Sequence, residues 1–321
     1  MNEKMKILIA YDGSDCANSA LDDLQRAGLP PEAEALIITV AEVFLPPPPP
    51  SSYEIVGALQ EEHYPFNFEE VYKRNERMVE EARSLALRAA ERLQKNFPGW
   101  QVSVEAYADS PSWCVLRKAG EWKPDLIVVG SHGRSALGRL VMGSISQKVL
   151  TEANCSVRVA RGRVEVDGSP VRIIIGIDGS PGAEAAVKAV AARRWPVGSE
   201  ARVIIVEDPL VPTLIGHLIP NVAKWIEESN KGEVDWMQKL AEHATEQLRS
   251  SELSVSSVVL KGNPKSVLVE EAEKWGADSI FVGSVGFSNR FERFMLGSVS
   301  AAVAARAHCS VEVVRAEKTE S

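Results

Sequence analysis

Short apolar runs alternate with longer amphipathic segments along the whole chain. The apolar runs form two series, at 6–11, 35–41, 102–107, 125–129 and 156–160, and again at 171–177, 202–206, 255–260, 278–282 and 310–314. Between them, apolar residues recur at helical spacing, for example at Ala17, Ala20, Leu21 and Leu24. Apolar strands that alternate with helices are typical of a parallel sheet covered by helices. We therefore predict an α/β protein built from two open sheets.

The second series repeats the first. Each half opens with an apolar run that leads into Asp-Gly-Ser, at Asp12 and at Asp178. Each half also has a cysteine just before its last apolar run, Cys155 or Cys309. Because the shared features occur in the same order, we expect two copies of one domain. We place the first domain at 1–162, a linker at 163–170, the second domain at 171–316 and a tail at 317–321.

A glycine pattern follows the fourth apolar run of each half. In the first half, nine residues separate Gly133 of the Gly130–Gly133 pair from Gly143 and Ser144. The second half has ten residues in the same gap, and its corresponding positions are Gly283, Gly286, Gly297 and Ser298. Glycines at a strand end let a ligand approach the backbone, and the next helix offers unpaired N–H groups to an anion. The pattern predicts a phosphate cradle in each half.

The aspartate that follows the first run is a further candidate ligand residue. Ligands of open α/β sheets bind beyond the carboxyl ends of the strands, where the strand order reverses. If the first and fourth strands are neighbours, Asp12 and Gly130 flank one crevice. A carboxylate repels phosphate but accepts hydrogen bonds from ribose hydroxyls, so Asp12 suits the sugar end of a nucleotide.

These residues resemble the universal stress protein family in its tandem-domain, ATP-binding form, over about residues 4–160 and 170–316. The first half matches the family's ATP-binding glycine motif without a gap, and the second half has one extra residue. The resemblance implies two adenine nucleotide alpha-hydrolase-like domains, each a five-stranded parallel sheet of order 3-2-1-4-5 flanked by helices. It also implies that the final strands of the two domains, at 157–160 and 311–314, pair and make the chain a pseudo-dimer.

The resemblance further assigns nucleotide contacts. From adenine and ribose to the outer phosphates, they are Asp12 and the Val40 backbone, then Gly130 and Gly133, then Gly143 and Ser144. The second half retains the corresponding Asp178, Val206, Gly283, Gly286, Gly297 and Ser298. Because one inserted residue shifts a tight loop, we expect less secure binding there, and a vestigial site kept for packing is the alternative.

Several side chains of the first cradle have both a ligand-binding and a purely structural interpretation. Arg134, which we count among the nucleotide contacts, and Arg139 could neutralise phosphate charge or be merely solvated. Ser144 begins a Ser-Ile-Ser-Gln sequence that fits a capping box, so its hydroxyl could cap the helix while a neighbouring amide binds phosphate. His132 has no visible acid or nucleophile as a partner, and we interpret it as a loop residue. We predict no catalytic residue.

Composition narrows the class of protein. The 321 residues, 45% of them hydrophobic and 25% charged, are typical of a soluble globular protein of two domains. A net charge of −8 argues against nucleic-acid binding. The chain has neither an apolar run near the ~20 residues of a membrane span nor a signal-peptide pattern at its start. Scattered cysteines, and histidines without metal-ligand spacing, predict a cytoplasmic protein with reduced thiols and no metal site.

Two segments that follow the second strand of each half have unusual composition. Pro46 to Pro50 predict a stiff, extended segment, which is either a lid or docking arm or a plain spacer. Residues 209–220 are apolar for a loop and suggest a cover over a pocket or an interface.

The leading functional hypothesis is a cytosolic stress-response regulator that binds ATP, with or without Mg²⁺, while AMP and ADP remain alternatives. Its further partners would be other copies of itself or an unidentified protein. A slow Mg²⁺-dependent ATPase or autokinase is the enzymatic alternative, because phosphoryl transfer depends more on positioning than on a strong base. A nucleotide-independent interaction module is the third hypothesis.

Overall fold

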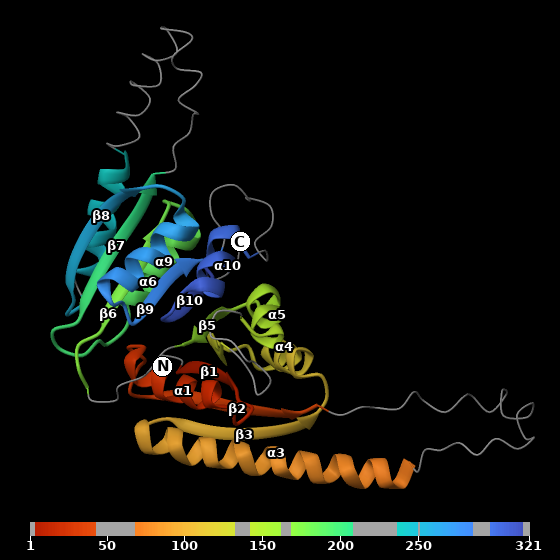
Figure 1. The fold of residues 1–321 in the computed structure, drawn as a ribbon. Helices are drawn as coiled ribbons and strands as arrows, with labels where there is room; N and C mark the ends of the chain where they lie inside the picture. Colours follow the sequence, from red (N-terminus) through yellow and green to blue (C-terminus); the bar gives the residue numbers. More distant parts are fainter. Residues whose placement is uncertain are drawn as a thin grey trace, which may run out of the picture.

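One ten-stranded sheet runs through both halves of the chain (Figure 1). The computed structural model describes residues 4–42, 68–131, 142–161, 168–207, 236–249, 251–284 and 296–316. The strand order is β3-β2-β1-β4-β5-β10-β9-β6-β7-β8. The predicted order 3-2-1-4-5 is thus confirmed for the first half, and the second half repeats it from the other end of the sheet.

The elements alternate as the apolar pattern predicts, and every predicted strand is present with limits that differ by at most two residues. The first half contains β1 (Met5–Ala10), α1 (Asp15–Asp23), η1 (Leu24–Arg26), β2 (Ala33–Ala41), α3 (Phe68–Asn96), β3 (Gln101–Ala108), α4 (Pro111–Trp122), β4 (Leu126–Gly130), α5 (Ser144–Glu152) and β5 (Ser156–Ala160). The second half contains β6 (Arg172–Ile177), α6 (Pro181–Ala191), β7 (Glu200–Glu207), β8 (Ser254–Lys261), α9 (Pro264–Trp275), β9 (Ser279–Gly283), α10 (Ser298–Arg306) and β10 (Ser310–Val314). Residues 236–248 form a further helix. Pro46 to Pro50 and residues 209–220 lie outside the described residues.

Apolar side chains form cores on both faces of the sheet. The face covered by α4, α5, α9 and α10 carries one core shared by the two halves. The opposite face carries two separate cores, one under α1 and α3 and one under α6 and the helix at 236–248. Within the described residues, continuous apolar packing across the middle of the sheet is therefore found on the first face alone.

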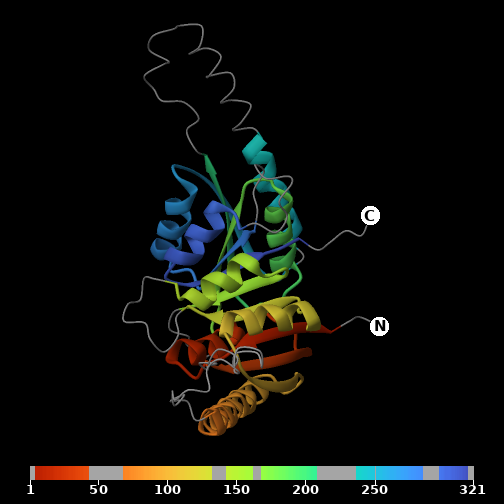
Figure 2. The same ribbon diagram turned by 90° about the vertical axis from the view of Figure 1, so that its right-hand side faces the viewer.

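The two halves join where β5 and β10 pair antiparallel. Figure 2 shows the first half, red to yellow-green, below the second half, green to blue. In the register, Arg158 lies opposite Glu312, with one valine pair on each side. The predicted pairing of the final strands within one chain is confirmed, and it satisfies backbone groups that would otherwise form open sheet edges.

Buried charges occupy the gap between the two separate cores. The Arg158 and Glu312 side chains are each 1% exposed. Arg158 donates to the Asp23 carboxylate through Nε at 2.5 Å and Nη2 at 3.0 Å, and to Glu312 through Nη1 at 3.4 Å. Arg193 donates to Glu312 and also to the Ala27 carbonyl at 2.8 Å. The chain of contacts Asp23–Arg158–Glu312–Arg193, which we call the charge chain, therefore alternates in sign across the joint.

Candidate functional site

The candidate site of the first half lies at the carboxyl edge of the sheet, where β1 is flanked by β2 and β4. All three strands are parallel, so their carboxyl ends share one edge. The register aligns Ala10 with Ile38, and the Tyr11 amide donates to the Ile38 carbonyl at 2.9 Å, so Asp12 and Val40 each lie two residues beyond the last aligned pair. In the second half Ile177 aligns with Ile205, so that Asp178 comes beside Val206. The strand order reverses at this point, which is where open α/β sheets bind ligands.

The turn after β1 is built by its Asp-Gly-Ser sequence. Asp12 Oδ1 accepts a hydrogen bond from the Ser14 amide at 3.0 Å, and Gly13 supplies a φ of 77°. Ser14 then caps α1, because its Oγ accepts from the Ala17 amide at 3.1 Å. The second half repeats the turn, with Asp178 Oδ1 accepting from the Ser180 amide at 3.0 Å. The local sequence thus holds each aspartate at the edge of the sheet.

Gly130 and Gly283 end β4 and β9, and they have a packing role in addition to the predicted one. A Cβ on Gly130 would lie 3.1 Å from the carbonyl carbon of Cys16, in the first turn of α1. A Cβ on Gly283 would lie 2.6 Å from the nitrogen of Ala183, in the first turn of α6. Both glycines therefore admit the start of a helix close to the strand end.

The helix that follows each glycine loop begins without a side-chain cap. Gly143 is the N-cap residue of α5, with no side-chain hydrogen bond, and Ser144 is the first helical residue. Gly297 and Ser298 have the same positions in α10. The capping-box interpretation of Ser144 is therefore wrong, because a hydroxyl at the first helical position lies past the N-cap site that it requires. The first amides of α5 have no intrahelical acceptor, as at the start of any α-helix, so they are available to an anion.

Serines close the base of both glycine loops, a feature that the motif did not indicate. The Gly143 amide donates to the Ser131 carbonyl at 2.8 Å, and Ser146 Oγ donates to the Gly130 carbonyl at 2.6 Å. The corresponding bonds of the second half run from the Gly297 amide to Ser284 at 2.6 Å and from Ser300 Oγ to Gly283 at 2.5 Å. The extra residue of the second loop therefore leaves the loop ends joined as in the first. A serine two places after each Gly-Ser pair is the sequence signal for this closure.

Several predicted positions lie outside the described residues. They are His132, Gly133, Arg134 and Arg139 of the first loop and Gly286 of the second. The described residues bring together Asp12, Val40, Gly130, Gly143 and Ser144 at one edge, and Asp178, Val206, Gly283, Gly297 and Ser298 at the corresponding edge.

A polar cluster beside Val40 distinguishes the first half from the second. Tyr107 pairs with Val40 across β2 and β3, and its hydroxyl donates to Glu105. Lys118 Nζ donates to the other oxygen of Glu105 at 2.8 Å. Burial raises the pKa of Glu105, but the hydrogen bonds from Lys118 and Tyr107 outweigh it, so the pKa lies below its usual value. The second half has Leu260 opposite Val206, so its edge is apolar at this place.

Two of the thiols are held in the protonated form at neutral pH. Burial raises the pKa of Cys155 and of Cys309 to about 12, so both remain protonated. All four cysteines are free. Among the described residues there is no cluster of metal-ligating side chains, and none of the described helices is long and apolar enough to span a membrane.

Comparisons with known proteins agree with this arrangement. The model of the universal stress protein family matches residues 4–161 and again 171–315. A universal stress protein of Mycolicibacterium smegmatis is 33% identical over 193 residues, 59% of this chain and 61% of that relative's length. One from Thermus aquaticus is 33% identical over 155 residues, 48% of this chain and 97% of the relative. A solved universal stress protein from Archaeoglobus fulgidus shares the fold, with a TM-score of 0.61, 18% identity, and coverage of 97% of this chain and 98% of that one. With two matches that together span most of its length, this chain belongs to the universal stress protein family and carries two domains of that family in tandem.

Proposed function

We propose that the first domain binds an adenine nucleotide, ATP in the first instance, at the edge formed by β1, β2 and β4. The observation that carries this proposal is the uncapped start of α5 directly behind the glycine loop, at the point where the strand order reverses. A helix start of this kind attracts phosphate through its free amides and its dipole. The Gly143 amide already donates to the Ser131 carbonyl, so the amides from Ser144 onward are the donors to phosphate in this proposal.

The other end of the nucleotide would lie toward Asp12 and Val40. Asp12 uses Oδ1 to hold the turn, which fixes the carboxylate at the edge of the sheet. A carboxylate accepts hydrogen bonds from ribose hydroxyls, and the Val40 backbone beside it suits the adenine edge. The polar cluster of Tyr107 and Glu105 next to Val40 is present in the first half alone, which supports a stronger site there than in the second half.

The proposed role is regulatory. Binding would alter conformation or partner affinity in a stress response and would not drive a turnover cycle. We propose cytoplasmic action, where free cysteines stay reduced, and domain limits at 1–162 and 171–316 with a linker at 163–170. The same proposal has three further parts. The preferred nucleotide is ATP and not AMP or ADP, Mg²⁺ accompanies it, and the partners are other proteins or further copies of the chain.

The test is equilibrium binding of ATP, ADP and AMP to protein stripped of bound ligand, with Gly143→Leu and Gly297→Leu as a matched pair. Gly143 has a φ of −63° and Gly297 a φ of −64°, which any residue adopts, so leucine adds bulk at the cradle without backbone strain. We expect micromolar binding by the wild type and at least about tenfold weaker binding by Gly143→Leu.

Comparison of Gly143→Leu with Gly297→Leu also shows which domain binds the nucleotide. A smaller effect of Gly297→Leu than of Gly143→Leu supports the first domain as the main site. Absence of nucleotide binding by the stripped wild type, or unchanged affinity in both variants, would overturn the proposal. Phosphate release measured on the same samples separates the ATPase alternative, which requires steady release that Gly143→Leu abolishes.

A further inference from the structure

A cavity of about 240 Å³ lies between the two halves, and its lining differs from the residues of the proposed nucleotide site. The first half contributes Asp23, Arg26 and Arg161 to its walls, and the second half contributes Asp278, His308 and Cys309. None of these residues belongs to the glycine loops or to the turns after β1 and β6. The cavity therefore requires an explanation of its own.

Arg161 is the unusual residue of this cavity. It directly follows β5 and is 9% exposed. Its Nη1 donates to the Ala307 carbonyl at the end of α10, at 2.7 Å. Its Nε and Nη2 are buried and have no hydrogen-bond partner. Burial lowers the pKa of Arg161, because the charged guanidinium is removed from water.

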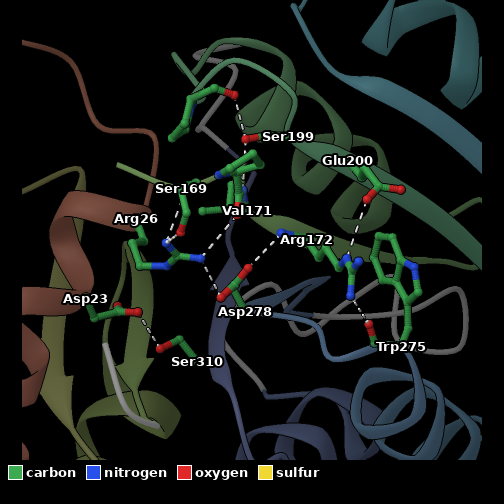
Figure 3. A network of polar contacts seen from close by, with 12 residues as sticks. Asp23, Arg26, Ser169, Val171, Arg172, Ser199, Glu200, Trp275, Asp278 and Ser310 are labelled. Atoms are coloured by element: carbon green, nitrogen blue, oxygen red, sulfur yellow. Dashed lines mark hydrogen bonds and ion pairs between the residues drawn. The ribbon is translucent and has the colours of Figure 1, made fainter. Parts of the chain in front are cut away.

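The carboxylates around the cavity are already engaged elsewhere. Asp23 Oδ1 accepts from Arg158 and from Ser310 Oγ, the latter at 2.7 Å. Asp278 accepts from Arg26 at 2.8 Å and from the Arg172 amide at 2.7 Å, as Figure 3 shows. Glu273, also in the lining, has a side chain that is 67% exposed and lies 3.8 Å from His308 Nε2. No carboxylate among the described residues pairs with Arg161.

The second half supplies an internal comparison in Arg315, which directly follows β10. The Arg161 amide donates to Ser310 Oγ at 3.0 Å, and the Arg315 amide donates to Ser156 Oγ at 3.2 Å. Arg315, however, uses both terminal nitrogens on carbonyls around the end of α5, Nη1 on Cys155 at 3.0 Å and Nη2 on Leu150 at 2.8 Å. Both arginines leave Nε without a partner. The difference is Nη2, which is satisfied in Arg315 and unsatisfied in Arg161.

We propose that the cavity binds a small oxyanion of the size of inorganic phosphate, with the Arg161 guanidinium as its charged donor. In the bound state the guanidinium would turn so that the unsatisfied Nη2 faces the anion, while Nη1 would stay near the Ala307 carbonyl at the end of α10. The volume is several times the ~30 Å³ that one water molecule occupies in the liquid, enough for a tetrahedral oxyanion with water around it. The bound anion would contact both halves, and its binding would therefore stabilise their association.

The test is thermal unfolding of the full chain with increasing inorganic phosphate, at ionic strength held constant with chloride. Arg161→Gln keeps a donor for the Ala307 carbonyl but removes the charge, and Arg315→Gln is the matched control outside the cavity. We expect a saturable rise of Tm for the wild type and Arg315→Gln, with at least about tenfold weaker apparent affinity for Arg161→Gln. A titration with glycerol phosphate in parallel distinguishes a free ion from the phosphate group of a small metabolite.

Gly143→Leu separates this proposal from the nucleotide site. If phosphate still raises the Tm of Gly143→Leu, the result supports binding in the cavity. If phosphate no longer raises the Tm of this variant, the anion binds in the glycine cradle, which overturns the cavity proposal and leaves the nucleotide proposal standing. A rise of Tm with phosphate that is unchanged in Arg161→Gln, or that does not saturate, also overturns the proposal, because it indicates an adventitious ion only. If Arg161→Gln fails to fold, wild-type crystals soaked in selenate provide the test by anomalous diffraction. A selenium peak beside Arg161 supports the proposal, and the absence of a peak there overturns it.

Discussion

At the scale of single residues, the glycines that end β4 and β9 serve the packing of helices as well as any ligand. The first turn of α1 lies against Gly130, and the first turn of α6 lies closer still against Gly283. In each case the neighbouring atoms belong to the backbone, which cannot swing aside as a side chain does. A motif glycine is therefore not evidence of a ligand by itself, because the same residue sets the distance between a helix and the sheet.

Alanine at these two glycines is expected to have unequal effects on stability. An added Cβ at Gly130 would lie 3.1 Å from the Cys16 carbonyl carbon, a tight contact that a small backbone shift can relieve, whereas at Gly283 it would overlap the Ala183 nitrogen at 2.6 Å. We expect Gly283→Ala to lower the free energy of unfolding by about 3 kcal/mol and Gly130→Ala by about 1 kcal/mol. Urea unfolding monitored by tryptophan fluorescence measures both, and equal losses would contradict the packing argument.

At the scale of elements, β5 and β10 determine how the two halves join. Val157 and Val159 of β5 and Val311 and Val313 of β10 enter the shared core. Arg158 and Glu312 point to the opposite face, between α1 and α6. The Arg158–Glu312 pair lies at the centre of the antiparallel register. Two copies of β5 paired in the same register would place two arginines opposite each other, which is unfavourable. The charges therefore favour the pairing of unlike halves.

Removal of the central cation is expected to weaken the joint strongly. Arg158→Met leaves Asp23 and Glu312 buried without the guanidinium that they share, and we expect a loss of about 3–5 kcal/mol in the free energy of unfolding. Lys188→Met removes an exposed cation paired with Glu184 on α6, with an expected loss of about 0.5 kcal/mol or less. Chemical denaturation of both variants is the measurement. The charge chain has no stabilising role if the two losses are alike.

At the scale of the whole molecule, the shared core makes the two halves one structural unit. On the face covered by α4, α5, α9 and α10, buried residues of both halves are in continuous contact, with Val159 and Val311 opposite each other at the joint. The ends of β5 and β10 are further tied by Arg161, which donates to the C-cap residue of α10, and by Arg315, which donates to the Leu150 carbonyl in α5. We therefore expect the chain to unfold cooperatively.

A substitution at the joint tests this cooperativity. Val311→Ala removes buried apolar volume from β10, and we expect it to lower the free energy of unfolding by about 2 kcal/mol. The loss should expose Cys114 of the first half and Cys309 of the second at the same lowered urea concentration. Alkylation of each cysteine across a urea series, read by mass spectrometry, provides the two probes. A shift confined to Cys309 would show that the halves unfold separately.

Much of the fold could be predicted from local patterns. Strands of a parallel sheet are buried on both faces, so they appear as continuous apolar runs, and all ten are found within two residues of their predicted limits. The Asp-Gly-Ser turns combine a side-chain acceptor, a glycine with positive φ and a helix cap within three residues. Such features depend on neighbours in the chain, and they place Asp12 and Asp178 correctly at the edge of the sheet.

Contacts between distant segments were decided only by the tertiary structure. Asp23 and Arg158 are separated by 135 residues, and Arg158 and Glu312 by 154, so no local pattern relates them. Ser144 fits a capping box in sequence, yet α5 begins at Ser144 itself, and the Gly143 amide before it donates to Ser131. Arg161 and Arg315 follow equivalent strands, but only Arg161 keeps an unpartnered Nη2 beside a cavity. The strands and turns thus follow from short-range chemistry, whereas the joint, its charges and its cavity exist only because β5 and β10 pair.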